Sequence, residues 1–337
     1  MTLISKRRKG KIVLTLNELK STGIWPANKP FTEKPGEKAL NELGLVMFYS
    51  GKNGDLYLIP DANKDVVLLM RSDRVSVFDI PIGDVVEGKG KIQNAISTLG
   101  AKYASNLGIR TALDSHYEIK NLPEEFKQRS QVIELCHPFE IEMNGETVQL
   151  ELIFRNYLTG SLYKAYQNGQ DPYQLHLEKG LQEWHKFDAP IFTPTTKGTT
   201  DVPLDGAKVA LKIPEIAKTL KNLFIDFSTY ASTRGITIID TKFEVFLNAK
   251  GDWVLGDEIL TPESSRFIMS ADFEAGNFKS MDKQLIRNHA ISDGWKERWI
   301  SEKAANPSQK FLEASIPAEI KKEVIKGYEY IYSLLKD

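Results

Sequence analysis

Residues 238–247 constrain the fold of this chain more than any other segment, because charged and apolar residues alternate along them. Successive side chains of a β-strand point to opposite faces, so Asp240, Lys242 and Glu244 are predicted to share one face. Charged side chains inside a fold are costly unless they pair with one another or bind a ligand. The segment therefore predicts a strand that carries polar chemistry on one side.

A turn at residues 248–252 and a second apolar run at 253–260 follow, and together they predict a β-hairpin. If four residues close the hairpin, Glu244 and Asp257 lie directly opposite each other, whereas a one-residue change in the loop moves Asp257 to the other face. Opposed carboxylates need a cation between them, and oxygen ligands indicate Mg²⁺ rather than zinc. The alternative is a solvated hairpin face with an ordinary Lys–Glu pair.

Composition narrows the class of protein. A chain of 337 residues is long for one core, so two lobes are expected. The 44 Lys and Arg nearly balance the 45 Asp and Glu, which argues against nucleic acid or an anionic membrane as a partner. Cys136 is the only cysteine, so no internal disulfide or cysteine metal cluster is expected, and a cytoplasmic location is favoured. We expect no signal peptide and no membrane span.

Hydrophobic patterning divides the chain into three parts. Residues 1–42, with a Pro-rich stretch, are expected to be an N-terminal extension. Residues 43–154 are expected to form a β-rich lobe, and residues 155–337 a more helical one. The predicted strands lie at 45–50, 56–59, 66–70 and 149–154, and the predicted amphipathic helices at 216–231 and 320–335.

Several other segments carry groups suited to anions. Thr159-Gly160-Ser161 is typical of a helix start, where free N–H groups favour anions, and Arg155 lies just before it. A plain Ser or Thr cap is the alternative. Further basic candidates are Lys52 in the glycine turn 51–54, Arg74, Lys89 in a Gly-Lys-Gly loop that does not match the P-loop pattern, and Arg266. The five histidines are scattered, and none is assigned a role.

Taken together and in this order, these segments resemble the SAICAR synthetase family, the phosphoribosylaminoimidazole-succinocarboxamide synthases. The resemblance extends from about Gly51 to the C-terminus. It is carried by SDRVSVFD (72–79), GKGKIQNAIS (88–97), RNYLTGSLYKAY (155–166), PIFTPTTK (190–197), DTKFE (240–244), GDEILTPESSRF (256–267) and DKQLIR (282–287).

The resemblance implies a fold and a reaction. The fold is two-lobed and α+β, with a kinase-like, β-rich ATP lobe and a larger α/β lobe for substrate and metal. The reaction joins L-aspartate to carboxyaminoimidazole ribonucleotide at the expense of ATP, with Mg²⁺ as cofactor, and releases ADP and phosphate. A homo-oligomer is compatible with this assignment.

The resemblance also implies roles for single residues. Lys242 is expected to face the reacting groups, and Glu244 and Asp257 to hold Mg²⁺ and ATP. The expected ATP loop is Gly51, Lys52, Asn53 and Gly54. The expected substrate-binding residues are Arg74, Lys89, Arg155, Ser161, Glu263, Arg266, Lys283 and Arg287.

The chain departs from the family pattern at several positions. Gly54 stands where the family usually has a basic residue, and residues 198–200 lack a usual histidine. Val245-Phe246 and Glu263 also differ, Glu263 standing for Asp. Two other functions are considered: a small-molecule kinase of the inositol polyphosphate type, which would release ADP without aspartate, and a non-catalytic nucleotide-binding paralogue.

Overall fold

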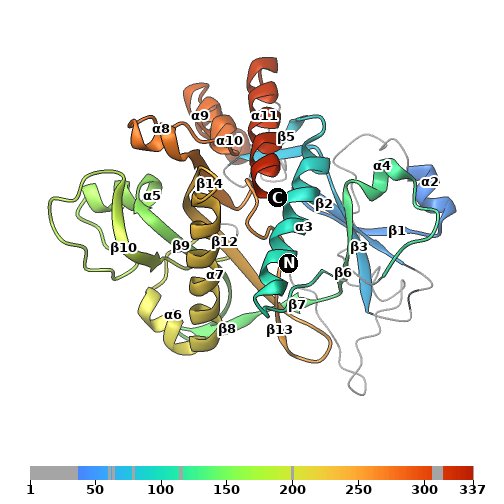
Figure 1. The fold of residues 1–337 in the computed structure, drawn as a ribbon, viewed down its shortest axis with the longest axis horizontal. Helices are drawn as coiled ribbons and strands as arrows, with labels where there is room; N and C mark the ends of the chain where they lie inside the picture. The colour runs from blue at the N-terminus through green and yellow to red at the C-terminus, as the bar shows by residue number, and fades with distance from the viewer. Residues whose placement is uncertain are drawn as a thin grey trace.

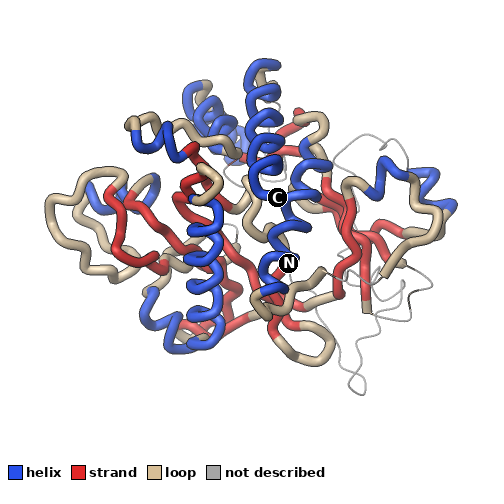
Figure 2. The backbone as a smooth tube through the Cα atoms, in the orientation of Figure 1, coloured by secondary structure: helices blue, strands red, loops and turns tan. Residues whose placement is uncertain are grey.

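A computed structural model describes residues 37–59, 62, 65–77, 80–113, 117–198, 201–305 and 314–336 of the chain. Most of the expected extension, and residues 78–79 of the SDRVSVFD motif, lie outside the described residues. The described part is built on a four-stranded and an eight-stranded sheet, with a two-stranded ribbon beside them (Figures 1 and 2). This mixture of helices and sheets confirms the predicted α+β class.

The smaller sheet is antiparallel and lies at the right of Figure 1. Its strands, in spatial order, are β1 (Val46–Ser50), β2 (Gly54–Leu58), β3 (Val66–Arg71) and β6 (Ser130–Glu134). Its core also contains Leu40 from α2 (Glu37–Glu42) and Phe126 from α4 (Glu124–Lys127). Leu40 is only 2% exposed, so the expected extension ends earlier than residue 42, because the lobe already includes α2.

The larger sheet is built around two long strands, β9 (Glu146–Leu158) and β12 (Ile236–Leu247), which run antiparallel. Their register places Asp240 opposite Arg155 and Lys242 opposite Ile153. The shorter strands of this sheet are β7 (His137–Pro138), β8 (Glu140–Met143), β10 (His185–Phe192), β11 (Thr195–Thr196), β13 (Trp253–Gly256) and β14 (Ser265–Met269).

Helices cover the larger sheet and join it to the smaller one. The apolar stripe predicted at 216–231 forms α7 (Pro214–Ser232), which packs on β12 (Figure 1). Helix α3 (Lys89–Asn106) contacts β3, β6 and the closing helix α11 (Ala318–Leu335). The remaining helices of the described residues are α5 (Gly160–Gln167), α6 (Gly206–Lys212), α8 (Ser270–Glu274), α9 (Gln284–Ser292) and α10 (Trp295–Ala305). No helix within the described ranges is long and apolar enough to cross a membrane.

The expected boundary between lobes at residues 154 and 155 does not follow the cores. It falls inside β9, a single strand of the larger sheet. The ribbon of β4 (Arg74–Val77) and β5 (Ile80–Val85) also contributes to the larger core, as does α3. The division at residue 154 stays a prediction from chain order, which does not decide which apolar face a strand covers.

Candidate active site

The polar face predicted for β12 forms a cluster of lysines and carboxylates. Lys242 Nζ lies 2.6 Å from Glu151 Oε1 on β9 and 3.2 Å from Glu244 Oε1. Lys197, just after β11, forms a second ion pair with Glu244. The side chains of Lys242 and Lys197 are 31% and 34% exposed, whereas that of Glu244 is 6% exposed. Two partly exposed lysine side chains are therefore paired with one buried carboxylate.

Electrostatics keep this cluster charged. Burial alone would raise the pKa of Glu244, but Lys242 and Lys197 hold it below its usual range. Burial alone would lower the pKa of Lys242, but Glu244 and Glu151 raise it above its usual range. Glu244 and Asp257 raise the pKa of Lys197 in the same way, against the effect of burial. Both lysines therefore offer a positive charge at neutral pH.

The hairpin register differs from the four-residue closure considered above. β12 and β13 pair Glu244 with Gly256 and Leu247 with Trp253, so residues 248–252 form a five-residue loop. Asp257 follows the end of β13 with a φ of 58°, a left-handed backbone conformation. Asp257 is exposed at the surface, yet it lies near Glu244: desolvation by the surrounding protein and Glu244 together raise the pKa of Asp257 above its usual range. The turn at Asp257, and not cross-strand pairing, brings the two carboxylates together.

Glu244 and Asp257 suit a magnesium ion shared with a nucleotide. Among the described residues, no group of three or more His, Cys, Asp and Glu could hold a metal. Mg²⁺ usually takes only one or two protein carboxylates and completes its shell with phosphate oxygens and water. The effect of Glu244 on the pKa of Asp257 indicates surplus negative charge, which a cation would offset. The donor set therefore fits Mg²⁺.

A second cluster lies further along β12, around Asp240. Arg155 Nη1 lies 2.8 Å from Asp240 Oδ2, and Arg266 Nε lies 2.9 Å from Asp240 Oδ1. Arg266 Nη2 makes a further bond to the same carboxylate. Burial would raise the pKa of Asp240, but Arg266 and Arg155 hold it below its usual range. Asp240 thus anchors both arginines.

The start of α5 lies against this second cluster. A Cβ atom added to Gly160 would be 3.3 Å from Arg266 Nη1, and Gly160 has a φ of 63°, so a side chain here would be strained. Thr159 caps α5 without a side-chain bond to the helix, and its hydroxyl donates instead to Glu183. Ser161 is exposed in the first turn. The structure therefore brings Arg155, the helix start and Arg266 together.

The glycine turn of the smaller lobe connects β1 and β2. The Gly51 N–H donates to the Gly54 carbonyl over 2.8 Å. A Cβ atom on Gly54 would lie 2.8 Å from the Met70 carbonyl, so the missing basic residue at this position has a steric reason. Lys52 is exposed, and Asn53 Nδ2 donates to Glu263 over 3.3 Å. The turn therefore contacts the loop that leads into β14, the strand that carries Arg266.

Three expected substrate ligands have internal partners instead. Arg74 is buried and bonds to Asp55 and to the Gly51 carbonyl, so it secures the glycine turn. Lys89 is completely buried and forms an ion pair with Glu263, which is also enclosed. Substrate contact by Arg74, Lys89 and Glu263 stays a prediction, and without ligand their side chains are enclosed among protein partners.

Lys283 and Arg287 lie one helical turn apart at the start of α9. Lys283 is buried and forms an ion pair with Glu263. Arg287 is half-buried and contributes to the low pKa of Asp240, so its charge acts on the second cluster.

Sequence reasoning missed Lys197, Glu151 and Tyr49 as parts of the first cluster. Lys197 ends the quoted PIFTPTTK motif, and Glu151 interrupts an apolar run at 150–154, so both carried a local signal. Tyr49 carried none. Burial raises the pKa of Tyr49, and Lys197, Asp257 and Glu244 all act on it, which places β1 beside the cluster.

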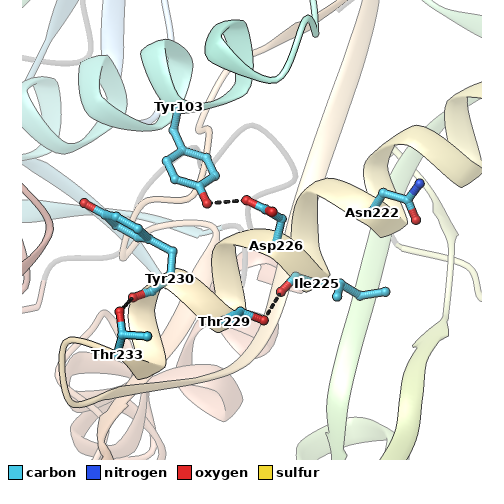
Figure 3. A pocket seen from close by; sticks show the side chains of 7 residues that line it. All are labelled: Tyr103, Asn222, Ile225, Asp226, Thr229, Tyr230 and Thr233. Atoms are coloured by element: carbon cyan, nitrogen blue, oxygen red, sulfur yellow. Dashed lines mark hydrogen bonds between the residues drawn. The ribbon is translucent and has the colours of Figure 1, made fainter.

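A surface pocket of about 550 Å³ lies elsewhere, between α3 and α7 (Figure 3). The hydroxyl of Tyr103 donates to Asp226 across it. The residues that line it are Tyr103, Asn222, Ile225, Asp226, Thr229, Tyr230 and Thr233. None of the predicted site residues is among them.

The fold and the two clusters define a class: an α+β protein whose basic side chains, paired with buried carboxylates along one strand, are suited to anionic ligands. Comparison with known proteins makes this specific. The SAICAR synthetase family model matches residues 47–301. The chain therefore belongs to the SAICAR synthetase family.

Individual relatives agree with this assignment. A phosphoribosylaminoimidazole-succinocarboxamide synthase from Actinobacillus succinogenes is 35% identical, over 87% of this chain and 99% of that protein. One from Neisseria meningitidis serogroup A is 33% identical, over 88% of this chain and 99% of that protein. A solved SAICAR synthase from Saccharomyces cerevisiae, complexed with SAICAR, has a TM-score of 0.66 and 27% identity and covers 90% of this chain and 97% of its own. The predicted purine-biosynthesis ligase is confirmed, and the kinase alternative is not favoured.

Proposed function

We propose that this chain joins L-aspartate to carboxyaminoimidazole ribonucleotide to form SAICAR, with ATP as the energy source and Mg²⁺ as cofactor, in the cytoplasm. The observation that carries the proposal is the placement of both clusters on one strand. Asp240 and Glu244 are four residues apart on β12, which corresponds to about 13 Å along a strand. That separation suits a ligand with a phosphate at one end and a carboxylate at the other.

The cluster around Asp240 suits the ribonucleotide phosphate. Asp240 occupies Nε and Nη2 of Arg266, while Nη1 lies against the start of α5. A phosphate at this point would meet the Arg266 guanidinium and the free N–H groups of the helix. Ser161 is exposed in the same turn and can donate a hydroxyl hydrogen bond.

The cluster around Glu244 suits chemistry at the ribonucleotide carboxylate. A carboxylate is a poor electrophile, so transfer of the terminal phosphoryl group of ATP first makes an acyl phosphate. The aspartate nitrogen then attacks the acyl carbon, a C–N bond forms, the C–O bond to phosphate breaks, and water takes the proton that the nitrogen loses. Lys242 and Lys197 stay protonated and offset charge on the reacting oxygens. Glu244 and Asp257 would hold Mg²⁺, which offsets charge on the ATP phosphates.

Release of ADP with each substrate omitted in turn tests this function. We expect ADP only when ATP, the ribonucleotide and aspartate are all present. ADP release without aspartate would support the kinase, and ATP binding without turnover would support the non-catalytic paralogue. Lys242→Met should lower turnover at least about a hundredfold. Lys279→Met is the matched control, because Lys279 forms an exposed ion pair with Glu323, and we expect it to have wild-type turnover.

A further inference from the structure

Glu263 joins four separate elements through one carboxylate. Its side chain is only 3% exposed. Asn53 Nδ2 of the glycine turn donates to it over 3.3 Å, and the Tyr328 hydroxyl of α11 donates over 2.8 Å. Lys89 Nζ at the start of α3 lies 3.3 Å away, and Lys283 Nζ at the start of α9 lies 3.0 Å away. Every partner comes from a different part of the chain.

Stability alone is a weak reason for such an arrangement. Taking charged groups out of water costs free energy that their mutual attraction often fails to recover, so buried ion pairs are frequently no more stable than apolar substitutes. Directional hydrogen bonds, however, fix where the bonded elements lie relative to one another. The position of Glu263 therefore points to a geometric role.

The elements that Glu263 holds carry the groups assigned to both ligands. On the nucleotide side, Asn53 is the neighbour of Lys52 in the glycine turn. On the ribonucleotide side, Arg266 lies three residues after Glu263, and Arg287 lies one turn after Lys283 in α9. A shift of the turn toward a nucleotide thus acts on α9 and, through the loop at Glu263, on β14, which carry the residues assigned to the ribonucleotide.

We propose that Glu263 is a positioning residue that couples nucleotide binding at residues 51–54 to ribonucleotide binding by Arg266 and Arg287. The inference rests on the proposed function and deepens it. Coupling of this kind is reciprocal, and it typically changes affinity by about 5- to 150-fold. Each ligand, once bound, fixes the position of the Glu263 partners and so prepares the site for the other.

Calorimetric titration of a non-hydrolysable ATP analogue with Mg²⁺, in the presence and absence of saturating ribonucleotide, measures the coupling. We expect the ribonucleotide to tighten analogue binding at least about fivefold in the wild type. In Glu263→Gln we expect less than about a twofold effect. Tyr328→Phe removes only the hydrogen bond from the Tyr328 hydroxyl to Glu263 and leaves the buried lysines paired. In this variant the fold-change in analogue affinity caused by the ribonucleotide should be less than half that of the wild type. Glu323→Gln, which removes an exposed ion pair on α11, should keep the full coupling.

The outcomes are separable. Independent binding of the two ligands to the wild type would overturn the proposal, as would full coupling in a folded Glu263→Gln variant. If that variant does not fold, full coupling in Tyr328→Phe overturns it. A purely structural role would lower the melting temperature of these variants and leave the coupling unchanged. Failure of the proposed function has a different signature, because the wild type would then lack ribonucleotide binding or aspartate-dependent ADP release.

Discussion

Replacing Asp257 by Asn separates the charge of this residue from its backbone conformation. Asp257 has a φ of 58°, a conformation that Asn and Asp tolerate better than other non-glycine residues. Asn therefore keeps the turn and removes the charge. Ala removes the charge as well, but in the left-handed conformation it costs roughly 1–2 kcal/mol.

The removed charge lies near Glu244, so its loss should stabilise the ligand-free protein. Asp257 is exposed, so solvent screens its repulsion with Glu244, and exposed charge pairs are worth only about 0–1 kcal/mol. Lys197 acts against this repulsion, so we expect the free energy of unfolding to rise by only about 0.5 kcal/mol. The unfolding entropy is about 2.1 cal/mol/K per residue, so for 337 residues this gain raises the melting temperature by about 0.7 °C. Asp257→Ala should melt about 1.5–3 °C below Asp257→Asn.

The pH dependence has a definite sign. Because the folded-state pKa of Asp257 is raised from 3.8, the folded state binds more protons than the unfolded state between that value and the raised pKa. The contribution of Asp257 to stability therefore falls as pH rises through this window. Asp257→Asn does not lose stability in this window. The difference in melting temperature between this variant and the wild type should therefore be small near pH 4 and reach its full size at pH 7.

Two measurements check this reasoning. Differential scanning calorimetry without ligand, from pH 4 to pH 7, tests the charge and the backbone. Equal melting temperatures for the Asn and Ala variants would refute the argument from the left-handed turn. Release of ADP against Mg²⁺ concentration tests the metal, and we expect Asp257→Asn to lose at least about a hundredfold in turnover. Near-normal turnover with an unchanged Mg²⁺ requirement would exclude Asp257 as a ligand.

Three further predictions concern other parts of the chain. Arg266→Ala should weaken ribonucleotide binding about ten- to a hundredfold in calorimetry while ATP affinity changes little, and Arg266→Lys should rescue it only in part; equal losses for both ligands would contradict this. Deletion of residues 1–38 should leave turnover and melting temperature unchanged. Deletion of residues 1–42 also removes the buried Leu40 and should lower the free energy of unfolding, measured by chemical denaturation, by about 2–5 kcal/mol. A 1–38 deletion that is folded but inactive would show that the extension completes the site. Gly100→Ala places a Cβ atom 2.2 Å from a backbone carbonyl that faces α3, so we expect the free energy of unfolding to fall by about 1–3 kcal/mol in the same measurement. Wild-type stability of this variant would refute the close approach.

The sequence alone determined the features that depend on local periodicity. Alternation along residues 238–247 correctly placed Asp240, Lys242 and Glu244 on one polar face of a strand, and the apolar stripe at 216–231 correctly predicted α7. Both follow from backbone geometry, which repeats every two residues in a strand and about every 3.6 in a helix. Neighbours in the chain are sufficient to fix such a pattern.

Only the tertiary structure decided which charges meet. Asp257 approaches Glu244 through a five-residue loop and a left-handed turn, although periodicity alone would have sent it to the other face of the strand. Lys197 reaches Glu244 from 47 residues away, and Lys89 turns inward to Glu263 from 174 residues away. A charged residue within an apolar stretch of sequence indicates that it needs an oppositely charged partner, but the sequence does not show which residue that partner is. Long-range packing determines the partner, because a charge that is buried without a partner costs several kcal/mol and destabilises the fold.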